Sequence, residues 1–257
     1  DNHNAIGYRM KTITAGTIRE CEIYPLFNRA QTAAIRRRRQ KTTRKAQRDL
    51  NKRNAQKTLI RLLNANFTSA DIWGTFTYNE KNLPDSPEAA HKVFRNYLRR
   101  LGYYMQRKGL GELKYVFVTE YIDKGEEIRI HHHVITNFPN RDIAEEKWRG
   151  GGRTQTRRLQ PDEAGLEGLG RYITKNRGVT VKNNRLWAAS HNLKRPKITV
   201  SDTAITRRQV QRICAFMTDT KEFIRRKNEA YSVTAVKIKY SDYVPGAYIY
   251  AKMRLNQ

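Results

Sequence analysis

Three consecutive histidines, His131, His132 and His133, are the residues of this sequence best suited to chemistry. The residues around them alternate as in a β-strand that buries one face, and in such a strand side chains two apart point to the same side. His131 and His133 therefore project together, and His132 points to the opposite face. Two imidazoles on a rigid strand can bind a metal ion or act as acid–base groups. Taken alone, the triplet is equally compatible with solvated or core histidines.

A carboxylate lies near the end of the strand predicted just before the histidines. Residues 114–121 are rich in β-formers, and residues 123–126 read as a polar turn, so the histidine strand returns antiparallel to them. Glu120 then reaches both imidazoles. Two histidines and one carboxylate leave positions open for substrate oxygens, and this mixed set suits Mn²⁺ or Mg²⁺, with Zn²⁺ as an alternative. A bound cation would polarise a phosphodiester oxygen.

Tyr172 and Lys175 follow in a helix predicted over residues 163–175. Their spacing of three places both side chains on one helical face. A phenol is a poor nucleophile at neutral pH because its pKa is about 10, but a nearby ammonium or metal ion favours the phenolate. By itself such a pair is most often an amphipathic tyrosine beside a surface lysine. Its position downstream of a two-histidine strand makes it a candidate nucleophile.

The charge balance indicates a polyanionic partner. The chain has 51 Lys and Arg against 24 Asp and Glu, a formal net charge of +27. Nucleic acid is the commonest target of such a field, and an anionic membrane is the competing partner. No apolar run approaches the roughly 20 residues needed to span a bilayer, no signal peptide is visible, and no P-loop signature occurs. Cys21 and Cys214 have no metal-site spacing, so we expect reduced thiols in a soluble, cytoplasmic protein.

The elements that must position these residues follow from local signals. Residues 1–35 read as an irregular or short-stranded lead, and a basic helix is expected within residues 36–61, with Thr42 or Thr43 as N-cap and Ala46, Leu50 and three later leucines as its apolar positions. Ser86 and Pro87 begin a second helix. Further elements are strands at 72–78 and 154–159, a short helix at 142–148, a basic helix at 206–227, and a hairpin of residues 233–240 and 247–253.

Three motifs in order resemble those of HUH endonucleases: Thr75–Tyr78, Arg129–Ile135 and Tyr172–Lys175. More narrowly, the chain resembles rolling-circle replication initiators of bacterial plasmids, phages and integrated elements, over about residues 67–180. Residues 186–196 and the opening at Met10 resemble one subgroup more loosely. Two-tyrosine relatives carry a second tyrosine four residues on, where this chain has Asn176, so it is similar to the single-tyrosine class.

The resemblance implies an α+β fold, with a central antiparallel sheet of about five strands flanked by helices in a ferredoxin- or RRM-like arrangement. A basic N-terminal helical arm (residues 1–66) would precede the endonuclease domain (67–200). A C-terminal helix and hairpin (201–257) would pack on the same domain. Initiators with their own helicase carry an ATPase domain, which this chain lacks, so a host helicase and polymerase are implied.

The resemblance also assigns roles to residues. Glu120, His131 and His133 would bind Mn²⁺ or Mg²⁺. Tyr172, accompanied by Lys175, would attack single-stranded or hairpin origin DNA in the bacterial cytoplasm, leaving a 5′-phosphotyrosine and a free 3′-hydroxyl. Candidates to grip the DNA are basic or aromatic residues of the arm and of the segment near residue 190: Arg36, Arg37, Arg38, Arg39, Lys41, Arg44, Lys45, Arg48, Trp187, Asn192, Lys194 and Arg195.

Two alternatives stay open. One keeps the enzyme class but makes the chain a single-tyrosine transposase or a conjugative relaxase. Such transposases are usually shorter and lack the basic arm, and relaxases place the tyrosine before the histidines. The other alternative is a non-enzymatic, basic nucleic-acid-binding protein with incidental histidines. It explains the charge but not the coincidence of Glu120, the histidine pair and Tyr172.

Overall fold

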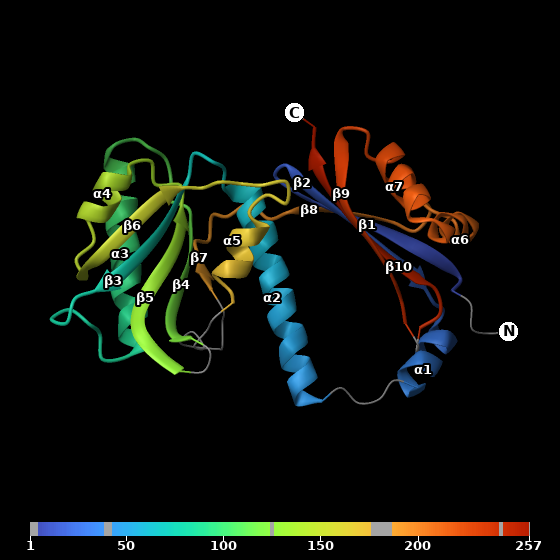
Figure 1. Ribbon diagram of the computed structural model, residues 1–257, viewed down its shortest axis with the longest axis horizontal. Coiled ribbons are helices and arrows are strands. Elements are labelled where there is room, and N and C mark those ends of the chain that lie inside the picture. Colours follow the sequence, from blue (N-terminus) through green and yellow to red (C-terminus); the bar gives the residue numbers. More distant parts are fainter. Residues whose placement is uncertain (1–4, 39–42, 124–125, 176–186, 242–243, 257) are drawn as a thin grey trace. The chain divides into compact units, whose positions relative to one another are not determined.

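The computed structural model describes residues 5–38, 43–123, 126–175, 187–241 and 244–256, which form an α+β fold with two antiparallel sheets of five strands each (Figure 1). The predicted fold class is therefore confirmed, although only one sheet was expected. Contacts divide the chain into two compact units. The central unit contains residues 51–162 and 166–194, and the terminal unit contains residues 1–50, 163–165 and 195–257. Among the described helices, none has the length and apolar character needed to cross a membrane.

The sheet of the central unit has the order β6-β3-β5-β4-β7, so the histidine strand β5 (Glu126–Thr136) is its middle strand. Its neighbours are β3 (Ile72–Tyr78) and β4 (Tyr115–Asp123), and the outer strands are β6 (Gly151–Arg158) and β7 (Ala188–Ala189). One face packs against α3 (Pro87–Arg107) and α4 (Arg141–Glu146). The other packs against α5 (Glu167–Tyr172) and the second half of α2 (Arg44–Asn66).

Strand alternation separates the two cores of this unit. On β4, Phe117 belongs to the cluster under α3, whereas Val116 and Val118 belong to the cluster under α2 and α5. On β5, Val134 and Ile135 divide in the same way. Because both faces of the sheet are covered, a polar side chain on β5 must either find a partner in a core or lie where the cover ends.

Two helix starts follow the expected capping chemistry. The Ser86 hydroxyl accepts the N–H of Ala89 at 3.2 Å at the start of α3, and Pro87 is the first helical residue. The Thr43 hydroxyl accepts the N–H of Ala46 at 3.1 Å at the start of α2. The basic stretch nevertheless forms two helices, α1 (Arg29–Arg38) and α2.

Only the second half of α2 docks. Leu59, Leu62 and Leu63 are buried as expected, together with Ile60. Ala46 and Leu50 are exposed, so their assignment to the apolar side was wrong. The first half of α2 is charged on every side, and it has no face on which burial would stabilise it.

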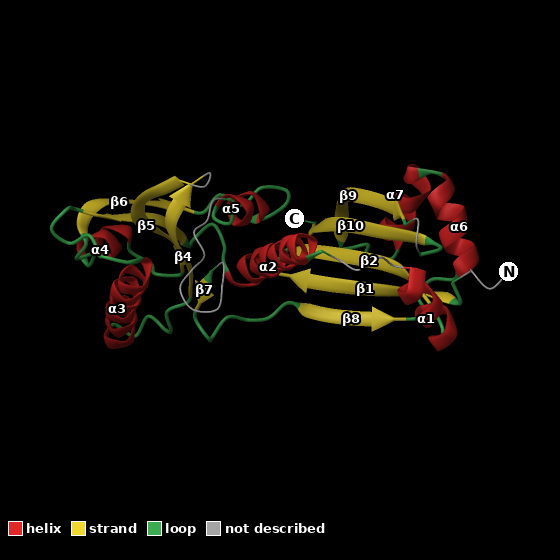
Figure 2. Ribbon diagram, turned by 90° about the horizontal axis from the view of Figure 1, so that it is seen from below, coloured by secondary structure: helices red, strands yellow, loops and turns green. Residues whose placement is uncertain are grey.

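The sheet of the terminal unit has the order β8-β1-β2-β10-β9 (Figure 2). Its strands are β1 (Gly7–Ala15), β2 (Ile18–Leu26), β8 (Lys197–Ser201), β9 (Tyr231–Tyr240) and β10 (Ala247–Leu255). Two helices, α6 (Arg207–Ala215) and α7 (Met217–Arg226), contribute Val210, Ile213 and Ile224 to a core with one face of this sheet.

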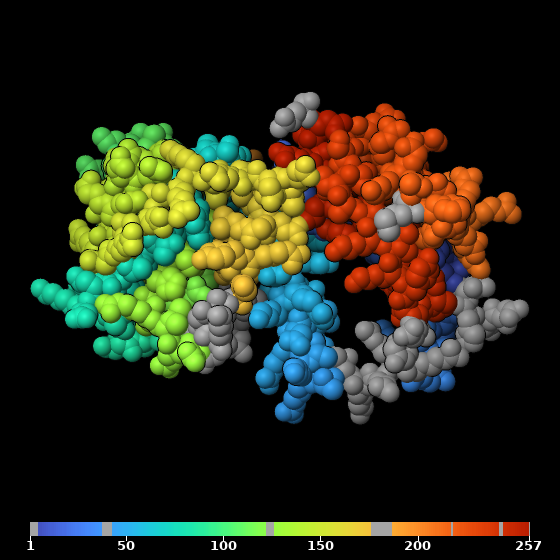
Figure 3. Space-filling model, in the orientation of Figure 1, coloured from blue at the N-terminus to red at the C-terminus, as the bar shows by residue number. Residues whose placement is uncertain are grey.

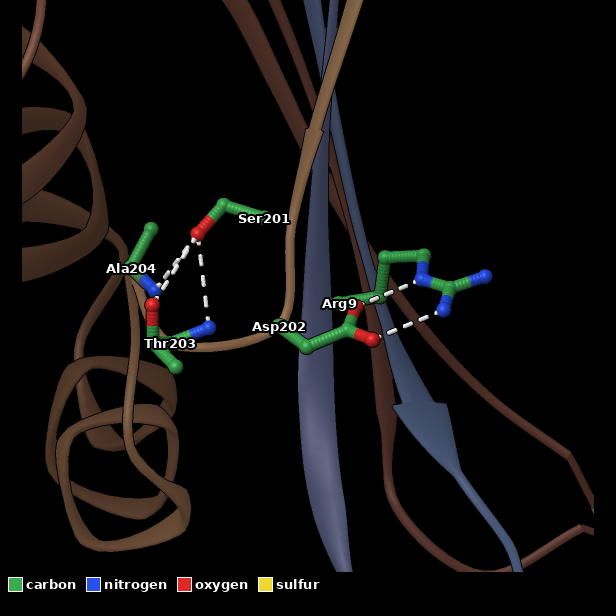
Figure 4. A network of polar contacts seen from close by, with 5 residues as sticks. All are labelled: Arg9, Ser201, Asp202, Thr203 and Ala204. Carbon is green, nitrogen blue, oxygen red and sulfur yellow. Dashed lines mark hydrogen bonds and ion pairs between the residues drawn. The ribbon is translucent and has the colours of Figure 1, made fainter.

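Polar contacts fix the junction between this sheet and α6 (Figure 4). The Arg9 guanidinium on β1 donates to both carboxylate oxygens of Asp202, at 2.6 and 2.8 Å. The Ser201 hydroxyl accepts the N–H groups of Thr203 and Ala204, at 3.3 and 3.1 Å. The end of β8 is thereby held to β1 where the chain turns towards α6.

The terminal unit corrects two expectations. Residues 7–26 are two nine-residue strands, and not an irregular lead. The helix expected at 206–227 is broken at Phe216, whose backbone is extended at φ −136° and ψ 137°. The predicted hairpin is confirmed as β9 and β10, but β10 pairs with β2 and not with the histidine sheet. The three predicted functional domains (1–66, 67–200 and 201–257) stay a proposal.

Candidate metal and nucleophile site

The register of the central sheet brings together the three predicted ligands. Glu120 on β4 lies directly opposite His131 on β5, and His133 lies two residues further along the same face. The Glu120 Oε2 atom is 3.2 Å from His131 Nε2 and 3.1 Å from His133 Nε2. One ligand atom from each residue lies within 4.8 Å of the others, so this group can hold a metal ion.

Hydrogen bonds on the far side of each ring orient the two imidazoles. His131 Nδ1 is 3.0 Å from the Arg129 carbonyl oxygen, which only accepts, so Nδ1 carries a proton. In neutral His131 the Nε2 lone pair then points at Glu120. His133 Nδ1 lies 3.1 Å from the Thr75 hydroxyl on β3. Such outer contacts hold ligand rings in place in metal sites.

The electrostatics of the cluster call for a positive charge at its centre. Burial alone would raise the pKa of Glu120, but its hydrogen bonds to His131 and His133 outweigh burial and lower that pKa to about 2. Burial lowers the pKa of His133, whereas contacts with Glu120 and the Arg129 carbonyl overcome burial and raise the pKa of His131. An anionic oxygen and two imidazole nitrogens aimed at one another fit a divalent cation, or a proton in its absence.

Tyr172 lies beside this cluster and is not part of a core. It is the last residue of α5 and is 60% exposed. Its ring centroid is 5.9 Å from that of His133 and 6.1 Å from that of Trp73. Trp73 in turn stacks on His133, with centroids 4.9 Å apart and planes 16° from parallel. The segment that carries α5 lies at the molecular surface (Figure 3).

Close packing of α5 on α2 sets the position of the tyrosine. A Cβ on Gly170 would lie 2.7 Å from Cγ1 of Ile60, so only glycine permits this approach. The Gln56 side chain on α2 donates to the Thr174 hydroxyl at 2.6 Å, and that hydroxyl donates to the Gly170 carbonyl at 2.6 Å. The chain just after Tyr172 is therefore tied to α2.

Lys175 lies beyond the end of α5, because the helix is shorter than the predicted span of 163–175. Its backbone N–H donates to the Tyr172 carbonyl at 3.0 Å, and its side chain is exposed. Within the described residues, the Lys175 side chain makes no hydrogen bond to the phenol. Its predicted role beside the nucleophile stays a proposal.

His132 points to the other face, as strand alternation predicts. It is fully buried, with Nε2 2.7 Å from the Tyr78 hydroxyl and Nδ1 3.0 Å from the Thr119 hydroxyl. Its ring stacks on Phe94, with centroids 4.2 Å apart. Burial holds its pKa well below the usual range. The middle histidine is a satisfied core residue.

The predicted DNA-gripping residues are spread over several elements. Arg36 and Arg37 on α1, and Arg44, Lys45 and Arg48 on α2, are exposed. Arg39 and Lys41 lie outside the described residues, as does the side chain of Arg38.

The remaining candidates differ in burial. Lys194 and Arg195 are exposed. Trp187 packs beside the core under α2, and its indole N–H donates to the Ala55 carbonyl at 3.3 Å. Asn192 donates to the Glu112 carboxylate and to the Leu113 carbonyl. DNA binding by any of the twelve candidates stays a proposal.

Two residues of this site were not assigned a role from the sequence. Trp73 and Thr75 lie on β3 at alternate positions, on the same face as His131 and His133. The alternation of β3 was readable in the sequence. Its pairing with β5 was not, because β6 and β4 compete as neighbours of either strand.

One comparison with known proteins bears on this site. Residues 71–177 match the model of a family of replication-associated proteins, the ORF2 family. The matched segment contains the metal-ligand candidates, Trp73, Tyr172 and Lys175. No curated protein and no solved structure matches the chain. The family match supports a role in the initiation of DNA replication.

Proposed function

We propose that this chain is a metal-dependent endonuclease that nicks single-stranded origin DNA through Tyr172 and starts rolling-circle replication. The observation that carries the proposal is the exposed phenol beside a cluster of one carboxylate and two imidazoles. The match to a replication-associated family supports the same process. We further propose Mn²⁺ or Mg²⁺ as the ion, and a host helicase and polymerase as partners.

In the proposed reaction the Tyr172 oxygen attacks the phosphorus of a phosphodiester. A bond forms between the phenolic oxygen and phosphorus, and the bond from phosphorus to the 3′ oxygen breaks. The phenol loses its proton, and the departing 3′ oxygen gains one as it becomes a hydroxyl. The products are a 5′-phosphotyrosine and a 3′ end that primes synthesis. Because one phosphoester replaces another, the step can reverse to rejoin the strand.

The side chains of the site position the reaction. A divalent ion held by Glu120, His131 and His133 would supply Lewis-acid stabilisation of charge on phosphate oxygens. Glu120 remains ionised at neutral pH because its pKa is lowered to about 2. Trp73 separates the phenol from open solvent on one side and stacks on His133. Fixed geometry of this kind lowers the barrier by orientation alone.

The test is formation of a covalent adduct. The protein is incubated with a panel of labelled hairpin oligonucleotides and Mn²⁺, and the products are separated under denaturing conditions. The wild type should give a protein–DNA adduct that Tyr172→Phe does not form. Tyr240→Phe, which alters an exposed tyrosine of the other unit, is the matched control. Adduct formation by Tyr172→Phe at the wild-type rate would refute the proposal.

A second measurement separates chemistry from folding. Tyr172→Phe should keep the DNA affinity and melting temperature of the wild type, because the exposed hydroxyl makes no hydrogen bond within the described residues. A variant that loses DNA binding as well would show that the substitution disturbs α5, and the adduct result would then not identify the nucleophile.

A further inference from the structure

A groove of about 780 Å³ runs along α3, within the central unit. One wall is the stripe of α3 that carries Arg95, Arg99 and Tyr103, and the other is the segment that follows the helix, around Leu113. The helix α3 covers the face of the sheet that holds His132, whereas the Glu120 cluster lies on the opposite face. The groove is therefore separate from the proposed cleavage site.

Two guanidinium groups in this groove have no acidic partner among the described residues. Arg95 and Arg99 are exposed and one helical turn apart, and no salt bridge in the described part of the chain involves either. Glu112 is the acidic residue among those that line the groove, and its carboxylate accepts a hydrogen bond from Asn192 at 3.0 Å. Unpaired guanidinium groups favour phosphate, which they can bind through two parallel hydrogen bonds.

An aromatic ring and a glycine complete the groove. Tyr103 lies one turn beyond Arg99 and is 60% exposed, so one side of its ring is open. Gly102 lies in the middle of α3, where glycine destabilises a helix relative to alanine. A Cβ at this position would meet only Cβ of Leu113, at an ordinary 3.9 Å. Packing therefore does not require the glycine, but its missing side chain keeps the groove hollow.

We propose that this groove binds the single-stranded DNA flanking the nick, with neighbouring phosphates on Arg95 and Arg99 and a base stacked on Tyr103. Exposed aromatic rings next to cations are the usual platform for unpaired bases. The choice of DNA as the polyanion rests on the proposed function. An acidic protein segment is the competing occupant, and the experiment distinguishes the two.

The first test compares two charge reversals on the same helix. Binding of a labelled oligothymidylate is measured by fluorescence anisotropy without divalent ions, across a range of salt concentrations. Arg95→Glu with Arg99→Glu should weaken binding by about tenfold or more and flatten the salt dependence by about 0.7 per lost phosphate contact. Lys92→Glu with Arg107→Glu makes the same change in net charge at exposed positions outside the groove. An equal loss in both double variants would overturn the proposal.

The second test leaves the charge unchanged. Gly102→Leu fills the groove with a better helix former, so the fold should be retained while affinity falls several-fold. Tyr103→Ala should weaken binding by about fivefold or more, and Tyr103→Phe should restore it. Wild-type affinity in Gly102→Leu would overturn the proposal. So would unchanged DNA binding together with lost binding of polyglutamate, which would assign the groove to an acidic protein segment.

These measurements do not depend on strand cleavage. Absence of an adduct would refute the nickase while leaving the groove result standing, because anisotropy without divalent ions reports binding alone. Conversely, the groove variants should still form the Tyr172 adduct on a short hairpin without flanking nucleotides. An adduct yield as low as that of Tyr172→Phe on this short substrate would place the groove residues in the cleavage site and overturn their separate role.

Discussion

The two faces of strand β5 use the same residue type in opposite ways. On one face His132 is buried between neutral partners, the hydroxyls of Tyr78 and Thr119, and its pKa is held well below the usual range. On the other face His131 and His133 share a carboxylate and border an exposed tyrosine. Adjacent positions of one strand thus belong to a core and to a candidate site.

The difference shows that the facing side chains decide what a histidine does. On β4, Thr119 meets His132, whereas its neighbour Glu120 meets the other two rings. A neutral hydroxyl satisfies a neutral imidazole and stabilises the fold. A carboxylate at the same distance leaves charge and lone pairs that only a cation or a proton balances.

The largest expected effect comes from emptying the carboxylate face. His131→Ala with His133→Ala removes both nitrogen ligands, so metal-dependent adduct formation should fall by about a hundredfold or more. Mn²⁺ should raise the melting temperature of the wild type but not that of the variant, because binding to the folded state stabilises it. A melting shift that survives in the double variant would show that the ion binds elsewhere.

The core face should respond in stability and not in chemistry. His132→Ala leaves a cavity and two unpaired hydroxyls, so the free energy of unfolding should fall by about 3 kcal/mol. The adduct rate per folded molecule should stay close to that of the wild type. Urea unfolding and adduct assays below the transition check both. Loss of the Mn²⁺-induced melting shift in His132→Ala would break the distinction between the two faces.

The candidate site was largely predictable because its signals are local. Alternation along one strand separated His132 from its neighbours, and a hairpin turn brought Glu120 opposite His131. The contacts of Trp73 and Thr75 were not predictable, because they depend on which strand lies next to β5. Sheet order is set by long-range packing, which no short window of sequence encodes.

The terminal unit shows the same limit at a larger scale. Residues 7–26 pair with β8 and β10, whose residues lie far along the chain, so the sheet they form was missed. The break at Phe216 was missed because the basic pattern continues through it. By contrast, β3 and the start of α3 have strong local signals and were predicted to the residue.

A smaller effect tests how sharply the carboxylate face is built. Trp73→Ala removes the ring that contacts both His133 and Tyr172, so the adduct rate should fall by about tenfold through loss of positioning. Trp73→Phe should recover most of the rate, and neither variant should alter the Mn²⁺-induced melting shift. Trp187→Phe, at a tryptophan of the same core away from the phenol, is the control. Equal losses in both tryptophan variants would assign Trp73 to packing alone.

The smallest effect is the acid response of the core histidine. The unfolded chain protonates His132 near pH 6.5, but the folded chain does so only at lower pH, so its contribution to stability is complete above about pH 6.5 and is lost as the pH falls. His133 acts in the same direction, and the raised pKa of His131 acts in the opposite one. His132→Leu removes only the first contribution. Urea unfolding with a chelator should therefore show the wild type losing up to about 1.4 kcal/mol per pH unit more than His132→Leu in weak acid. Parallel pH profiles would mean that the buried imidazole accepts a proton in place, and the contrast between the two faces would then lie in geometry and not in charge.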